Sequence, residues 1–474
     1  MIEHPTRERS GGDLSEAKSA VEGSRPLAFL ILLLLITVAA GFSLLWTLGR
    51  WSWDVDEVET LQELHLTSGG GASNPGSQFS RSPRLMPIWY WCQGQVMAHL
   101  PLNEKNARLL PALCGLVFVL GAFVWAWLGQ GRTFAILLAV MILASPLFLA
   151  LAQQARFYTM AVLFQFLAQV SILSPVRRFP VGMILLSILL SSIAILCHNL
   201  LLVYFVLGAG AALVAAVLGW CNRATLVRSL AAAAAGICLY FFYLRHIIQG
   251  WNEFLPHRTS FQVANSLLSE VGIPMLALSL LGVVLSLRKE DQKRNGYWAV
   301  LGVCSVAFIL AAPLAIWFFN YRYTLLFLLP TWILAAKGAV SIGNALVDRR
   351  SRWAWYACAV VLLMPKAISY YQDGSRRDIR NAAEIVSQRA HKDSPVVYCN
   401  LPAILRYYLP NAIVNDYRDG KMKESSCYVV LATNAWDAPL RVEGRVSELI
   451  ATVGRRRFDE QSYLVRIYHV STRP

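Results

Sequence analysis

The stretch LAFLILLLLITVAAGFSLLWTLGRWSWDVDEVETLQELH, residues 27–65, joins an uncharged apolar run to a cluster of acids. The run 27–48 is long enough to cross the roughly 30 Å hydrocarbon core of a bilayer as one helix. It lacks a small-residue cleavage site, so it predicts a retained transmembrane helix rather than a signal peptide. The acids that follow it are Asp54, Asp56, Glu57, Glu59 and Glu63.

The composition of the whole chain favours a polytopic membrane protein. Of its 474 residues, 56% are hydrophobic and only 15% are charged, with a mean hydropathy of +0.47. Soluble domains carry about 25% charged residues. The net charge of +15 is compatible with either nucleic acid or an anionic membrane as partner. Because the basic residues lie in short connectors between apolar runs, we expect a membrane protein that binds no nucleic acid.

Apolar runs of spanning length recur along the first three quarters of the chain. We expect about eleven transmembrane helices, at 27–48, 109–128, 133–152, 157–174, 180–197, 199–219, 229–244, 267–287, 297–319, 322–342 and 353–370. The connectors alternate in charge: one set holds twelve Lys and Arg, and the other holds only Arg156, Arg245, Arg258 and Arg322. The positive-inside rule places the richer set in the cytoplasm.

This orientation predicts a multi-pass protein of the cytoplasmic (inner) membrane, divided into three parts. Residues 1–26 are a cytoplasmic tail, and 27–370 are the transmembrane part with a first external loop at 49–108. Residues 371–474 alternate between strand-like and helix-like patterns, which indicates a small extracytoplasmic α/β domain. The predicted strands include SPVVYC, SCYVVLAT and QSYLVRIYHV, and the predicted helices are DIRNAAEIVSQRA and RVSELIATVG. Cys399 and Cys427 can pair if this domain is oxidised.

The acidic segment fits a short amphipathic helix. Val55, Val58, Leu61 and Leu64 form an apolar stripe, and the remaining face carries Asp56, Glu59, Thr60 and Glu63. Asp54 fits the N-cap position, with Glu57 as its capping-box partner. Two hypotheses follow: the acids cap and solvate a surface helix, or one of them is a general base beside the membrane.

A set of motifs in order along the chain carries a resemblance to a known family. These are DVDEVET (54–60), RLMPIWYWCQGQVMAHLP (84–101), NARLLPALCGLVFVLGAF (106–123), ASPLFLALAQQARFYTMAVLFQFLA (144–168), CHNLLLVYF (197–205), RYTLLFLLPTWILAAKG (322–338) and RRDIRNAAEIV (376–386). Together they resemble the C superfamily of polytopic glycosyltransferases. The likeness is to bacterial relatives of the protein O-mannosyltransferases and of the lipid A aminoarabinose transferase.

The resemblance implies sugar transfer from a polyprenyl-phosphate-linked donor to a hydroxyl or amine. The acceptor is then a protein, a lipid or a polysaccharide, and the membrane lipids surround the enzyme. Asp56 is the implied general base, with Glu57 as its neighbour and helper. A divalent metal ion is an optional cofactor, and its candidate ligands are Asp56, Glu57 and His198. One departure is Met86, which stands where many relatives have His or Lys before the Pro of the surface helix.

Further residues at the external ends of the spans are candidates for binding the donor. Arginine suits a leaving phosphate, and aromatic rings suit a sugar. Each candidate also has a structural alternative: snorkelling for Arg156 and Arg322, an aromatic belt for Tyr158, a structural role for His198, and a solvated loop for residues 245–258. The predicted substrate-binding set is Arg84, Arg156, Tyr158, His198, Arg245, His257, Arg258, Arg322 and Tyr323.

Two other classes of protein share parts of this pattern. A lipid or glycolipid transporter also has many spans, but transporters usually place ionisable residues within their spans. Here the spans are nearly uncharged and the polar residues gather at one membrane face. A non-catalytic relative in envelope glycan assembly is the third class. We found no nucleotide-binding motif, which agrees with a lipid-linked donor.

Overall fold

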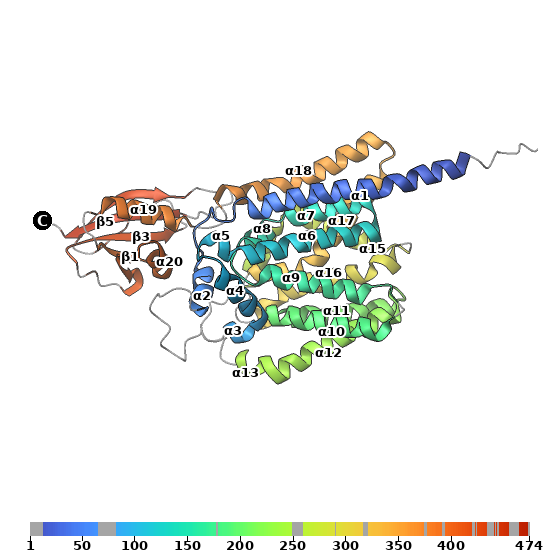
Figure 1. Ribbon diagram of the computed structural model, residues 1–474, viewed down its shortest axis with the longest axis horizontal. Coiled ribbons are helices and arrows are strands. Elements are labelled where there is room, and N and C mark those ends of the chain that lie inside the picture. Colours follow the sequence, from blue (N-terminus) through green and yellow to red (C-terminus); the bar gives the residue numbers. More distant parts are fainter. Residues whose placement is uncertain are drawn as a thin grey trace, which may run out of the picture.

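A computed structural model gives the architecture of the chain (Figure 1). It describes residues 13–64, 82–176, 179–248, 259–289, 291–315, 321–373, 377–390, 394–419, 422, 424–433, 440, 442, 445–454 and 464–472. The greater part is a bundle of helices, and a small mixed sheet with two helices lies at one end of it.

The bundle is built from the apolar runs of the sequence. Its helices are α1 (Asp13–Leu45), α6 (Leu109–Gln130), α7 (Arg132–Leu143), α8 (Pro146–Ala152), α9 (Tyr158–Leu173), α10 (Pro180–Cys197), α11 (Leu201–Val217), α12 (Arg223–Leu239), α13 (Arg245–Ile248), α14 (Ser260–Val271), α15 (Ile273–Ser286), α16 (Gln292–Ala315), α17 (Leu329–Ala345) and α18 (Arg349–Asp373). A π-helical turn, Tyr240–Leu244, joins α12 to α13, and a 3-10 helix, η3 (Tyr321–Phe327), precedes α17.

The expected number of eleven spans is not confirmed. Among the described residues, five helices are long and apolar enough to cross a membrane, and six if the bent pair α7–α8 counts as one span. That pair bends by 66° where Ser145 caps α8 and Pro146 begins it. Two other expected spans are also interrupted: Gly272 separates α14 from α15, and the last turn before α17 is a 3-10 helix. Turn residues inside apolar runs therefore divide the chain more finely than hydropathy indicates.

Close packing of two helices fixes the position of η3. A Cβ added at Gly282 of α15 would lie 1.9 Å from the Leu334 oxygen of α17, and one at Gly338 would lie 2.2 Å from the Leu278 oxygen. Only glycine permits this approach of the two backbones. Gln165 of α9 also donates a hydrogen bond of 2.6 Å to the Leu326 oxygen of η3. These contacts locate the short helix that carries Arg322 and Tyr323.

Four short helices at one end of the bundle come from the segment between α1 and α6. They are α2 (Val55–Glu63), α3 (Ser82–Leu85), α4 (Pro87–His99) and α5 (Glu104–Ala107). The expected cap of α2 is confirmed, since Asp54 and Glu57 form a reciprocal capping box. Val58 and Leu61 are buried, whereas Asp56, Glu59 and Glu63 lie on the less buried face of the helix.

The C-terminal part holds a five-stranded sheet in the order β2-β1-β3-β5-β4. Parallel pairing joins β1 (Val396–Cys399) to β2 (Ile413–Asp416) and to β3 (Ser426–Thr433), and β5 (Leu464–Thr472) is antiparallel to both β3 and β4 (Arg445–Val453). Two helices, α19 (Ile379–Arg389) and α20 (Pro402–Tyr408), complete this unit. Figure 1 shows it at the same end of the bundle as α2 to α5.

One expectation for this unit is wrong, and one question that the sequence left open, the pairing of Cys399 with Cys427, is answered. The segment RVSELIATVG is not a helix but strand β4 at the edge of the sheet. Its pairing with β5 is irregular between Leu449 and Ala451, and Val446 and Leu449 are exposed at this edge, so its apolar residues do not alternate between the faces as in a regular strand. Cys399 and Cys427 are unpaired, because they belong to hydrophobic clusters on opposite faces of the sheet.

Candidate active site

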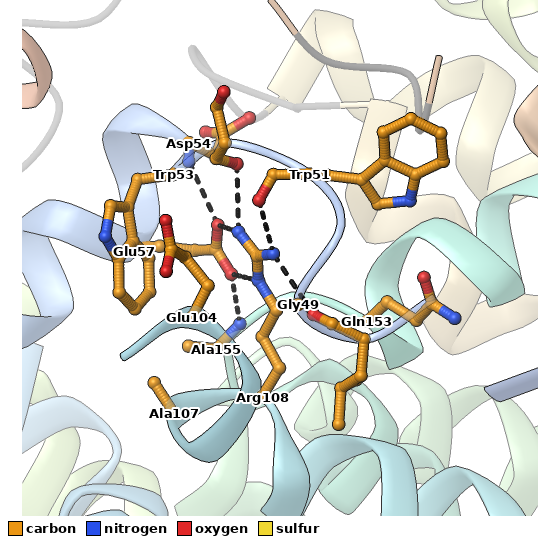
Figure 2. Close-up of polar contacts among 12 residues, drawn as sticks. Gly49, Trp51, Trp53, Asp54, Glu57, Glu104, Ala107, Arg108, Gln153 and Ala155 are labelled. Atoms are coloured by element: carbon orange, nitrogen blue, oxygen red, sulfur yellow. Dashed lines mark hydrogen bonds and ion pairs between the residues drawn. The ribbon is translucent and has the colours of Figure 1, made fainter. Parts of the chain in front are cut away.

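Glu57 of α2 forms an ion pair with Arg108, at the end of the bundle where α2 lies (Figure 2). Both side chains are fully buried. Arg108 Nε and Nη2 each donate to the Glu57 carboxylate at 2.8 Å. Its remaining donors reach the carbonyls of Leu48, Trp51 and Ser52 at 3.3, 2.8 and 2.9 Å. All five N–H groups of the guanidinium are therefore used.

The Glu57 carboxylate likewise makes all its hydrogen bonds with groups of the protein. Besides the two bonds from Arg108, Oε1 accepts from the Ala155 amide at 2.7 Å and Oε2 accepts from the Asp54 amide at 2.9 Å. Glu57 thus joins α2 to the start of α6 and to the loop that carries Arg156. These contacts tie α2 to its neighbours, and the role of Glu57 as helper of Asp56 stays a prediction.

Asp56 lies on a more accessible side of α2 than Glu57 does, and it faces two arginines. Arg322 of η3 forms ion pairs with Asp56 and with Asp54, the latter at 3.4 Å. Arg156 donates from Nη1 to the Asp56 carbonyl at 3.1 Å and to the Thr60 hydroxyl at 3.0 Å. Its Nε is buried and has no hydrogen-bond partner among the described residues. The pKa of Arg156 is raised: burial is the largest single effect and opposes its charge, but Asp56, Tyr90, Tyr158 and Glu59 together outweigh it.

Three rings lie next to these charges. His198 is 5.8 Å from Tyr158 and 5.1 Å from Tyr323 between ring centroids, and the two tyrosines are 6.4 Å apart. Burial, with a smaller contribution from Arg156, lowers the pKa of His198 to about 3, so this imidazole is neutral at pH 7. Its Nδ1 accepts from the Leu200 amide at 3.3 Å, which places the proton on Nε2. Nε2 is buried without a hydrogen-bond partner in the described part of the chain.

The third acid on this face of α2 is Glu59. It is half-buried and makes neither a hydrogen bond nor an ion pair with any described residue. Burial and the neighbouring Asp56 carboxylate raise its pKa to about 7 from an ordinary 4.5. One turn further along, Glu63 accepts a hydrogen bond from the Tyr90 hydroxyl of α4. Sequence reasoning did not single out Tyr90, whose only local signal is its place in the motif that opens α4.

The predicted substrate-binding residues fall into three groups. Arg156, Tyr158, His198, Arg322 and Tyr323 come together around Asp56, although they belong to three separate segments of the chain. Arg84 and Arg245 are both exposed, on the adjoining short helices α3 and α13. Their segments are joined by the Tyr243 hydroxyl, which donates to the Arg84 carbonyl at 2.8 Å. His257 and Arg258 lie outside the described residues.

The three candidate metal ligands do not form a metal site. The Glu57 oxygens already accept four hydrogen bonds, so they have no lone pair left for a cation. Within the described ranges, no group of three His, Cys, Asp or Glu side chains is arranged to hold a metal ion. We therefore assign no step of the chemistry to a metal.

The buried ion pair of Glu57 and Arg108 predicts a large loss of stability when one partner is removed. Replacing Arg108 with Met leaves the Glu57 carboxylate buried without its counter-charge, and breaking such a pair costs about 3–5 kcal/mol. We expect the free energy of unfolding to fall by that amount, and Arg84→Met, a change at an exposed arginine, to alter it little. Thermal and denaturant unfolding of the purified protein measures both. Equal stability of the two variants would contradict the role given to the pair.

Glu59 makes the stability depend on pH. Its folded-state pKa of about 7 lies above the ordinary 4.5, so between these values the folded state holds a proton that the unfolded state has lost. Stability therefore falls as pH rises from about 4.5 to 7 and stays level above that. We expect Glu59→Gln to remove this fall, with a gain over the wild type of about 1–3 kcal/mol at pH 8 and little gain at pH 4.5. If the free energies of unfolding of the two proteins change in parallel with pH, this prediction is wrong.

Comparisons with known proteins agree on the architecture. No protein-family model matches the sequence and no curated protein matches it. The structure is similar to that of ArnT from Cupriavidus metallidurans, with a TM-score of 0.52 bound to undecaprenyl phosphate and 0.53 in the apo state. Sequence identity is 12% and 11%, and the match covers 93% and 94% of this chain and 98% of ArnT.

A second similar structure is the Archaeoglobus fulgidus oligosaccharyltransferase in complex with zinc and sulfate. Its TM-score is 0.51 at 11% identity, and the match covers 84% of this chain and 67% of that enzyme. Both neighbours are polytopic glycosyltransferases. The chain therefore has the GT-C-type glycosyltransferase fold over almost its whole length, as its sequence motifs predict.

Proposed function

We propose that this protein transfers a sugar from a polyprenyl-phosphate-linked donor to a hydroxyl or amine of an acceptor. The observation that carries the proposal is the meeting of Asp56 with Arg156 and Arg322 at one end of a GT-C-type fold. The ArnT structure that contains undecaprenyl phosphate supports a lipid-linked donor. The acceptor is a protein, a lipid or a polysaccharide. We place the reaction at the outer face of the cytoplasmic membrane, as the distribution of positive charge in the sequence predicts.

The chemistry requires a base and a site for the departing phosphate. The acceptor oxygen or nitrogen bonds to the anomeric carbon, its proton passes to Asp56, and the bond between that carbon and the phosphate oxygen breaks with its electron pair on phosphate. Arg322 and Arg156 are the cations placed to stabilise the phosphate as its charge develops. Attack from the face opposite the phosphate inverts the anomeric centre.

In the present state Arg322 is paired with both Asp56 and Asp54. A donor phosphate competes with these carboxylates for the same guanidinium. When the phosphate binds Arg322, Asp56 loses its ion pair and becomes free to accept a proton. Donor binding and activation of the base are thereby linked through one side chain. Of the two tyrosines beside the charges, Tyr158 is buried and Tyr323 is half-buried, so we assign contact with the sugar ring to Tyr323.

The test is transfer from a lipid-linked sugar by purified protein in lipid. For Asp56→Asn we expect the turnover rate to fall by a factor of about 10² to 10⁴, the usual contribution of a positioned base. Its affinity for the donor should be unchanged or higher, because the carboxylate that competes for Arg322 is gone. Arg322→Ala should instead weaken donor binding. Asp416→Asn, the same change on strand β2 away from the site, is the matched control.

Each alternative function has its own outcome in this assay. Full activity of Asp56→Asn would show that another group is the base. Movement of the intact lipid-linked sugar across vesicles, with no transfer to any acceptor, would support a transporter. Binding of the donor with neither transfer nor movement would support a non-catalytic relative.

A further inference from the structure

The segment that leads into α2 is held from two sides. Arg108 of the bundle and Arg380 of α19 both donate to the Trp51 carbonyl, at 2.8 and 3.4 Å. Arg380 Nη2 also reaches the Gly49 carbonyl at 3.3 Å and forms an ion pair of 2.6 Å with Glu104 of α5. Residues 49–53 therefore lie between a cation of the helical bundle and a cation of the C-terminal unit.

Side chains of the C-terminal unit also bond directly to the start of α2. The Tyr408 hydroxyl accepts from the Trp53 amide at 2.9 Å and donates to Glu104 at 2.7 Å. One hydroxyl thus joins α20, α5 and the residue that precedes the N-cap of α2. The Ser52 hydroxyl adds a second link, since it donates to Asp378 and accepts from the Arg380 amide, both at 3.1 Å.

The apolar face of α2 packs against the same unit. Val58, Leu61 and the adjoining Trp53 are at most 2% exposed, and they share one hydrophobic cluster with Ile404 and Leu405 of α20. The Trp53 ring also meets Tyr407 edge to face, with 5.5 Å between the centroids. This face of α2 is the one opposite Asp56, Glu59 and Glu63. The helix that carries the proposed base is therefore seated partly on the C-terminal unit.

We propose that Arg380 and Tyr408 are positioning residues for the transfer reaction, and that the C-terminal α/β unit is a structural part of the active site. Their contacts end at residues 49–53, directly before the cap of α2, so they act on Asp56 through the backbone. Loss of these contacts allows α2 to move relative to η3, which carries Arg322. The catalytic consequence rests on the proposed function, whereas the positional claim does not.

The experiment compares two Tyr→Phe variants of the full-length protein in lipid. Tyr408→Phe removes the hydroxyl that joins Trp53 to Glu104 and leaves the ring in place. Tyr428→Phe is the matched control, because its exposed hydroxyl donates to the Arg389 carbonyl within the C-terminal unit. Hydrogen–deuterium exchange of residues 49–64 reports on α2 and its lead-in without any substrate. Turnover and KM for the donor report on the reaction.

For Tyr408→Phe we expect faster exchange in 49–64, unchanged exchange in β1, β3 and β5, and a roughly tenfold lower kcat with little change in donor KM. Arg380→Lys, which keeps the charge but loses the planar fork, should show the same pattern more weakly. If Tyr408→Phe matches Tyr428→Phe in both exchange and kcat, the proposal is wrong. If the wild type transfers no sugar, the proposed function fails, but the exchange result still decides the positional claim.

Discussion

The buried ion pair of Glu57 and Arg108 is the interaction on which the rest of the site depends. The two residues lie 51 positions apart, and between them they use every hydrogen-bonding group of both side chains. A charge in such a place is stable only if its partners are complete. The pair therefore fixes three segments at once: the lead-in to α2, the start of α6, and the loop before Arg156. Burial of Glu57 also leaves its neighbour Asp56, about 100° further round the helix, on a more accessible side.

Beyond this pair, the site holds more acids than arginines. Asp54 and Asp56 share Arg322, and Arg156 lies near Glu59 and three rings. The neutral His198 adds no positive charge at pH 7, so the two arginines carry the electrostatic role that a phosphate requires. Glu59 has no fixed partner among the described residues, which makes this end of the bundle sensitive to pH.

The sequence predicts well those features that depend on residues close together in the chain. The cap at Asp54, its box partner Glu57 and the apolar stripe of α2 are set by spacing along one helix, and the structure confirms the capping box and the burial of Val58 and Leu61. Ordered motifs also indicated the fold, despite 11–12% identity to the similar structures. Local patterns could not predict the partner of Glu57, because Arg108 is 51 positions away and only folding brings the two together. The pairing of β4 with β5 is likewise a long-range feature that the local pattern of RVSELIATVG does not contain.

The central claim is that this end of the bundle binds a polyprenyl-phosphate sugar through Arg322. The most direct measurement is mass spectrometry of lipids that co-purify with the protein from native membranes. We predict a polyprenyl phosphate, with or without its sugar, bound to the wild type and to Asp56→Asn but depleted from Arg322→Ala. Recovery of bulk phospholipid alone from all three proteins, together with no transfer from any lipid-linked sugar, would contradict it.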